Sequence, residues 1–175
     1  MIDLETLSTN PNATILTVGG VKFDPYTNIE PGQGIYFRVD VDSQTEMGRD
    51  VMKETLDWWG QQDTEIMEEA LGDKDRISLD QMIKTINKWC VGVDVFWCQG
   101  PLFDYAILQN FYAQMNVPVP WNYWQIRDSR TLFSLVPRDP KEKRTGLHNA
   151  LEDCYFQAKK VQKVFHELDI KNDRY

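Results

Sequence analysis

The chain has 175 residues, of which 42% are hydrophobic and 26% are charged, an ordinary balance for a globular protein with a substantial core. Its formal net charge of −8 argues against a passive nucleic-acid-binding protein, because such proteins usually carry a basic surface that neutralises phosphates. The charge does not exclude an enzyme that holds an anionic substrate through divalent cations bound to carboxylates.

The beginning of the chain has the pattern of three strands. Residues 1–6 are predicted to form a short strand, and residues 14–23 a longer one that is rich in β-branched side chains. The pair Gly19-Gly20 in the second strand indicates a bulge or a close packing approach. Residues 34–41 alternate between polar and apolar side chains and complete a three-stranded meander.

Helical spacing of apolar residues dominates the rest of the chain, interrupted by one short strand of the buried type. Ser78 precedes one of the helices and is expected to cap it. This order of elements predicts an α/β architecture in which helices pack on the faces of a mixed sheet. The helices are predicted over residues 53–61, 64–71, 78–89, 104–115, 128–136 and 149–168, the strand over residues 93–97, and a charged loop over residues 137–146.

No internal repeat, low-complexity tract or linker divides the sequence, so we expect a single domain over residues 1–175. No apolar run is long enough to span a bilayer and no signal peptide is evident, which favours a cytoplasmic protein that has no membrane partner. Cys90, Cys98 and Cys154 are scattered without a CxxC pair, as expected for free thiols in a reducing compartment.

Two acids lie close together in the first predicted strand. Side chains alternate between the faces of a strand, so Asp3 and Glu5 point to one face while Ile2 and Leu4 point to the other. Two carboxylates on one face of a core strand are costly to bury unless a cation lies between them, and oxygen ligands suit Mg²⁺ or Mn²⁺. The D-x-E spacing alone is weak, and a solvent-facing edge strand explains it more simply.

Two later segments carry further residues that can bind metal or transfer protons. Asp104 follows a predicted strand and a turn, at the carboxyl end of the strand, where α/β sheets build sites; Asp is also a common helix N-cap. His148 precedes the last predicted helix, although a lone histidine there is usually a surface residue. Asp153 lies near the start of that helix, and the competing acid Glu152 should point about 100° away from it.

Together, these segments resemble the DEDDh branch of the DnaQ-like 3′→5′ exonucleases. That family has D-x-E on its first strand, an Asp after a central strand and H-x₄-D on a late helix. Here the corresponding residues are Asp3, Glu5, Asp104, His148 and Asp153. The segments TLDWW at residues 55–59 and RDSRT at residues 127–131 resemble the phage and bacterial group that includes exonuclease VIII-like and DexA-like enzymes.

The resemblance implies a ribonuclease H-like fold with a mixed five-stranded sheet and helices on both faces, formed by a single exonuclease domain. It implies that Asp3, Glu5, Asp104 and Asp153 bind two divalent metal ions, Mg²⁺ or Mn²⁺. His148 would be the general base that takes a proton from the attacking water, so all five residues are expected to be catalytic. The implied reaction is hydrolysis of phosphodiester bonds at 3′ ends, with release of nucleoside 5′-monophosphates.

The same resemblance places further residues near the substrate. Thr6 and Leu7 follow the acidic pair, where relatives contact the terminal 3′-hydroxyl and the last base, although ordinary strand-end packing is the alternative. Phe103 would stack on a base or fill the core. Of the adjacent Trp58 and Trp59, one is expected in the core and the other near the nucleic acid. The expected substrate-binding residues are Thr6, Leu7, Phe103, Trp59 and Arg130.

The expected substrate is the 3′ end of single-stranded nucleic acid, with DNA slightly favoured over RNA. The alternatives are a 3′→5′ exoribonuclease and a catalytically silent nucleic-acid-binding module on the same fold. Arg130 would hold a phosphate or form a structural salt bridge. Relatives are often homodimers, and six tryptophans leave apolar material for such an interface. The expected location is the cytoplasm of a bacterium or of a phage-infected host cell.

Overall fold

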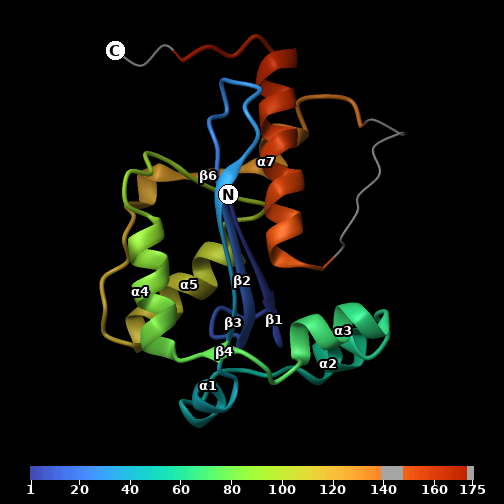
Figure 1. Ribbon diagram of the computed structural model, residues 1–175, viewed down its shortest axis with the longest axis vertical. Coiled ribbons are helices and arrows are strands. Elements are labelled where there is room, and N and C mark those ends of the chain that lie inside the picture. The colour runs from blue at the N-terminus through green and yellow to red at the C-terminus, as the bar shows by residue number, and fades with distance from the viewer. Residues whose placement is uncertain (139–147, 173–175) are drawn as a thin grey trace.

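A mixed sheet with helices on both sides forms the centre of the computed structural model, which describes residues 1–138 and 148–172 (Figure 1). β1 pairs antiparallel with β2 and β2 pairs antiparallel with β3, which confirms the predicted meander. A two-residue strand, β4, then pairs parallel with β3 and makes the sheet mixed. The four strands are β1 Ile2–Thr6, β2 Ile15–Lys22, β3 Gly32–Val39 and β4 Arg76–Ile77.

The structure does not confirm the predicted five-stranded, ribonuclease H-like sheet. Hydrogen bonds divide the strands of the described residues into this four-stranded sheet and a parallel pair, β5 (Phe96–Cys98) and β6 (Ile126–Asp128). β5 lies beside β1, but the backbone N–H of Leu4 in β1 donates to the carboxylate of Asp104 at 3.2 Å. A side-chain acceptor thus replaces a strand carbonyl at this edge of the sheet. The strand predicted over residues 93–97 is shorter in the structure, where β5 begins only at Phe96.

Helices cover both faces of the sheet, as predicted. α7 (Ala150–Glu167) packs against β1 and β2, and α4 (Leu79–Trp89) and α5 (Asp104–Gln114) lie on the opposite side in Figure 1. The remaining helices are α1 Asp42–Glu46, α2 Lys53–Trp59, α3 Thr64–Leu71, the 3₁₀ turn η1 Tyr123–Gln125 and α6 Ser129–Phe133. α1, β4, η1 and β6 were not predicted, and residues 139–146 of the predicted charged loop lie outside the described residues.

Side-chain caps fix the starts of three helices. Ser78 caps α4, as its position predicts, through a reciprocal capping box. Asp128 caps α6 and Asn149 caps α7, and in each case the side-chain oxygen accepts backbone N–H groups of the first turn. The cap at Asn149 leaves His148 just outside α7 and places Asp153 in its opening turns.

The core is divided by the sheet, and this division orients the acids of β1. Ile2 and Leu4 are buried in a cluster that includes residues of α4 and α5. Asp3 and Glu5 therefore face the other side, which α7 covers, as strand alternation predicts.

The three cysteines are buried and free, which confirms the prediction of free thiols. Burial raises the pKa of each of the three thiols. Within the part of the chain that the structure describes, no helix has the length and apolar character needed to cross a membrane.

Candidate active site

Three carboxylates meet between β1 and α7. One oxygen from each of Asp3, Glu5 and Asp153 lies within 4.8 Å of the other two. Asp3 and Glu5 come from one face of β1, and Asp153 comes from the first part of α7, where it is 3% exposed. A strand at one end of the chain and a helix near the other thus supply oxygen atoms to one small volume.

The fourth predicted acid, Asp104, is the first residue of α5 and is 3% exposed. Its Oδ1 accepts the hydrogen bond from the backbone N–H of Leu4 at 3.2 Å. Because Leu4 lies between Asp3 and Glu5, this bond ties the start of α5 to the acidic pair. The charge of Asp104 also acts on Asp3, so the four acids form one electrostatic cluster, which is called the acidic cluster below.

The close approach of α7 to the sheet depends on Gly19, which is the register partner of Asp3 in β2. A Cβ atom at Gly19 would lie 2.2 Å from the backbone carbon of Ala150 and 2.4 Å from the backbone nitrogen of Leu151. The first turn of α7 therefore rests directly on the backbone of β2. This contact brings Asp153 within reach of β1, and it confirms the expected close packing at the Gly19-Gly20 pair.

Burial and mutual repulsion make the charged form of the cluster unfavourable. Burial raises the pKa of Asp3 well above its usual value, and the charges of Asp104, Glu5 and Asp153 raise it further. Burial also raises the pKa of Asp104 to about 7, although the Leu4 N–H and other hydrogen bonds oppose the shift. Carboxylate oxygens that crowd one another in this way fit hard divalent cations such as Mg²⁺ and Mn²⁺, because the ions offset the repulsion.

His148, the predicted general base, lies immediately before α7 with a φ of 64°, in the left-handed region. Its ring meets the ring of Trp58 edge to face, with 4.7 Å between the centroids, and lies 6.4 Å from the ring of Trp59. The end of α7 that carries Asp153 is therefore linked through His148 to α2.

Residues 1–165 match the sequence model of a family described as the 3′-5′ exoribonuclease Rv2179c-like domain. The chain belongs to this family. The matched span contains the whole acidic cluster and His148. A comparison with curated proteins finds no match. Membership of the Rv2179c-like family indicates that the enzyme is a nuclease and that the substrate is a nucleic acid.

In this Rv2179c-like domain a pocket of about 460 Å³ opens next to the acidic cluster. Glu5 and Thr6 of β1, Trp58 and Trp59 of α2, and Phe103 all line the pocket. It thus joins one acid of the cluster to three aromatic rings, and it has room for a nucleobase.

The two adjacent tryptophans of the pocket differ in exposure. Trp59 is 1% exposed, and its indole N–H donates to the backbone oxygen of Thr6 at 3.0 Å. Trp58 is 38% exposed and contacts His148, so it presents more surface to a ligand than Trp59, which was the residue expected to bind substrate. Trp59 holds α2 against β1 and forms a wall of the pocket.

The other predicted substrate residues of the Rv2179c-like domain have mixed surroundings. Leu7 is buried in a cluster with Trp59, which agrees with the strand-end alternative. Phe103 is partly buried, packs against the core and also lines the pocket. Arg130 is exposed, donates to the backbone oxygen of Gln99 at 3.0 Å, and its charge partly opposes the rise that burial causes in the pKa of Asp104.

Sequence patterns missed one residue of the site, Gln157. Its side chain is 1% exposed, and Nε2 donates to Oδ1 of Asp3 at 3.0 Å. This bond stabilises the charged form of Asp3 and holds its carboxylate in one orientation. Gln157 lies four residues after Asp153, on the same face of α7, and this spacing was the available signal.

The metal-free Rv2179c-like domain should become less stable as the pH rises from about 4 to 8. The pKa of Asp104 is about 7 in the folded protein, above the usual 3.8, so the folded state binds more protons between these values. This contribution to stability is complete below pH 3.8 and is lost as the pH rises through about 7. Urea unfolding in EDTA at several pH values measures it, with Asp104→Asn as the reference that lacks the ionisation. A wild-type pH dependence equal to that of Asp104→Asn would contradict the prediction.

Proposed function

We propose that this protein is a metal-dependent 3′→5′ exoribonuclease of the DEDDh type that acts on single-stranded 3′ ends. The observation that carries the proposal is the convergence of Asp3, Glu5 and Asp153 beside a pocket lined with aromatic rings. The family's activity favours RNA over the DNA that was slightly preferred from the sequence, because its description is that of an exoribonuclease. The single domain over residues 1–175 is part of this proposal, while the cytoplasmic location and the homodimer stay predictions.

Different side chains bind the metal ions and accept the proton of the attacking water. Asp3, Glu5, Asp104 and Asp153 would hold two divalent cations, Mg²⁺ or Mn²⁺. When bound, the ions neutralise the charge that develops on the phosphoryl oxygens and lower the pKa of water. His148 accepts the proton of the attacking water, a role that suits a side chain whose unperturbed pKa is about 6.5.

The pocket selects the end of the strand. Phe103 and Trp58 offer ring faces or edges to the terminal base, and stacking on an aromatic side chain contributes about 1–3 kcal/mol per base. Thr6 and Trp59 form the part of the pocket next to Glu5, and Leu7 supports them from the core. The charge of Arg130 acts on Asp104, and in this proposal Arg130 would hold a phosphate of the substrate.

Digestion of matched single- and double-stranded RNA and DNA oligonucleotides, each labelled at the 5′ end, tests the proposal. With Mg²⁺ or Mn²⁺ we expect stepwise shortening from the 3′ end of single-stranded RNA and release of nucleoside 5′-monophosphates. A 3′-phosphate should block the reaction, and EDTA should abolish it. Cleavage of a circular RNA would identify an endonuclease instead. Binding of RNA without cleavage at any metal concentration would identify the silent module.

Trp58→Leu should lower the rate of nucleotide release about 2- to 10-fold. The edge-to-face contact with His148 is of a kind that contributes about 0.5–1.5 kcal/mol, and its loss leaves the general base less well placed. Trp58→Phe, which keeps a ring edge, should retain more of the rate. Trp124→Leu is the control, because Trp124 is 59% exposed and lies outside the pocket. Equal rates for Trp58→Leu and Trp124→Leu would remove Trp58 from the site.

A further inference from the structure

A buried glutamine of α7, Gln157, contacts one acid of the acidic cluster. Its Nε2 donates to Oδ1 of Asp3 at 3.0 Å, and its side chain is 1% exposed. Among residues 1–138 and 148–172, its other polar atom, Oε1, is buried and has no hydrogen-bond partner. A buried polar atom without a partner lowers stability, whereas an apolar side chain of the same shape would not. The stability of the fold therefore does not account for an amide at this position.

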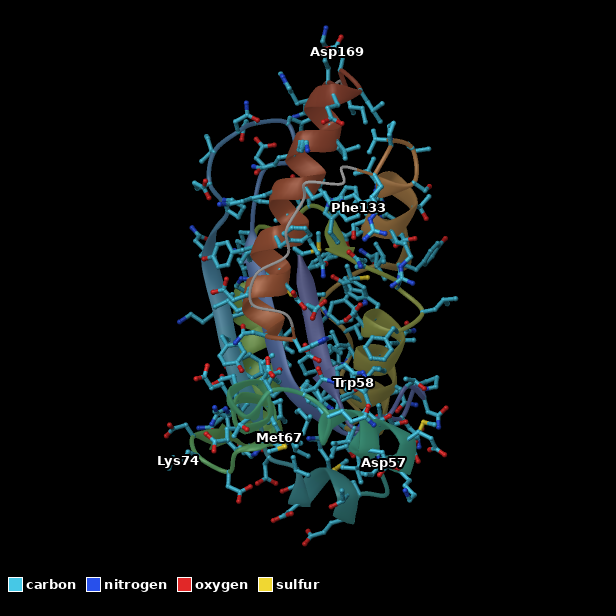
Figure 2. All side chains as sticks on the ribbon, turned by 90° about the vertical axis from the view of Figure 1, so that its right-hand side faces the viewer. Asp57, Trp58, Met67, Lys74, Phe133 and Asp169 are labelled. Atoms are coloured by element: carbon cyan, nitrogen blue, oxygen red, sulfur yellow. The ribbon has the colours of Figure 1, made fainter. Side chains whose placement is uncertain are left out.

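A second buried glutamine of α7 bonds the backbone instead. Nε2 of Gln162 donates to the backbone oxygens of Asp24 and Ile29, at 3.0 and 2.8 Å. These bonds join α7 to the segment between β2 and β3. Figure 2 shows the end of α7 near Asp169, and Gln162 lies five residues closer to that end than Gln157. The contact with a carboxylate of the cluster thus distinguishes Gln157 from a glutamine that only holds the helix in place.

The bond from Gln157 limits how Asp3 binds a cation. A carboxylate binds a cation through one oxygen or through both. Oδ1 of Asp3 already accepts the hydrogen bond from Gln157, and the partly positive N–H group competes with a cation for that oxygen. Asp3 is therefore best suited to bind an ion through its other oxygen alone. The cluster fits this mode, because a single oxygen from each of Asp3, Glu5 and Asp153 suffices to bring the three acids within 4.8 Å of one another.

Divalent cations differ in how many carboxylate oxygens they use. Mg²⁺ requires a near-octahedral set of ligands at about 2.0–2.1 Å and usually keeps several waters. Ca²⁺ takes about 6–8 oxygen ligands at about 2.3–2.6 Å, and carboxylates often bind it through both oxygens. An Asp3 that supplies a single oxygen thus removes a ligand from Ca²⁺ and none from Mg²⁺.

We propose that Gln157 is a positioning residue that sets the metal preference of the acidic cluster. By occupying Oδ1 of Asp3, it limits that acid to one ligand oxygen and so favours Mg²⁺ over Ca²⁺. This inference rests on the proposed metal-dependent function and adds to it the residue that selects the ion. Packing fixes the amide in place, because α7 rests on the backbone of β2 at Gly19, the register partner of Asp3.

Gln157→Met tests the proposal, because methionine is unbranched like glutamine and donates no hydrogen bond. Mg²⁺ alone and Ca²⁺ alone are titrated into the full chain without RNA, after metal has been removed with EDTA, and calorimetry gives each Kd. We expect the Kd for Mg²⁺ to rise about tenfold or more, since loss of a hydrogen bond to a metal ligand weakens binding about 10- to 100-fold. The Kd for Ca²⁺ should rise at most about threefold, because Ca²⁺ gains the second oxygen of Asp3.

Gln162→Met is the matched control. It removes a buried amide from the same helix together with two hydrogen bonds to backbone oxygens, so it should lower Tm. Its ratio of the Kd for Ca²⁺ to the Kd for Mg²⁺ should stay within about twofold of wild type. A preference that depended only on the stability of α7 would change in this variant as well. Thermal unfolding in EDTA establishes that each variant is folded.

An unchanged ratio in Gln157→Met would overturn the proposal, as would an equal change in Gln162→Met. Wild type itself provides a test that needs no variant, because tighter binding of Ca²⁺ than of Mg²⁺ would also overturn it. If wild type prefers Mg²⁺ through Gln157 but releases no nucleotide from RNA, the proposal stands and the exonuclease function fails. If wild type degrades RNA with Mg²⁺ while Gln157→Met keeps the wild-type ratio, the function stands and the proposal fails.

Discussion

Asp3→Asn is expected to lose at least about 10³-fold in nuclease rate and yet to unfold at a higher temperature than wild type when no metal is bound. In the proposed mechanism Asp3 binds metal among the other three acids of the cluster, whose charges all act on it. The rate falls because a neutral amide holds divalent cations poorly. A loss of that size corresponds to about 4 kcal/mol of transition-state stabilisation.

The gain in stability of Asp3→Asn has a separate cause. Burial and three neighbouring carboxylates raise the pKa of Asp3, so at pH 8 its ionised form is strained in the metal-free protein. Asparagine removes that charge, and its Oδ1 still accepts the hydrogen bond from Nε2 of Gln157. We expect a gain on the order of 1 kcal/mol, or about 2–4 °C in Tm for a chain of this length.

Calorimetry in EDTA and with added Mg²⁺, together with single-turnover rates, measures both effects. Added Mg²⁺ should raise the Tm of wild type and leave that of Asp3→Asn nearly unchanged, because only an intact set of ligands binds the ion tightly. Glu68→Gln, which removes a charge from an exposed position on α3, should change neither the rate nor the response to Mg²⁺. A variant with the full wild-type rate would show that Asp3 is not a metal ligand.

Gly19→Ala is the second change with a large expected effect. The added methyl group would meet backbone atoms of Ala150 and Leu151 at 2.2–2.4 Å, and backbone cannot rotate away as a flexible side chain can. The first turn of α7 must therefore move off β2. We expect a loss of about 1–3 kcal/mol in stability and of at least about 100-fold in rate, because misplacing a catalytic group by about 1 Å has effects of that size.

Gly32→Ala is the matched control for this substitution. Gly32 also lies in the sheet, in β3, but a Cβ atom there meets nothing within 4 Å. Its rate and Tm should stay close to those of wild type. If Gly19→Ala keeps the wild-type rate and stability, α7 does not need to rest on β2, and the position of Asp153 depends on other contacts. Urea unfolding and single-turnover kinetics on the two variants decide this.

Features that depend on a few neighbouring residues were predictable from the sequence. Strand alternation places Asp3 and Glu5 on one face of β1. The capping preference of Ser78 locates the start of α4. The two-residue strand β4 and the three-residue strand β6 were not predictable, because segments this short are strands only through the partners that pair with them.

The adjacent tryptophans also show what local sequence predicts and what tertiary packing decides. On a helix they point about 100° apart, so the sequence predicts that one is buried and the other lies near the ligand, without saying which. The docking of α2 on β1 decides the matter, because the indole N–H of Trp59 reaches the backbone oxygen of Thr6. Trp58 is consequently the ring that remains 38% exposed and contacts His148.

The sequence by itself predicted which carboxylate and imidazole side chains form the proposed site, which elements carry them and which face of β1 the first two acids occupy. Tertiary structure decided that Asp153 meets those acids and that Gln157 orients Asp3. The physical reason is range. Alternation and capping act within a few residues, whereas these contacts join segments far apart in the chain and exist only once α7 has packed on β2 at Gly19.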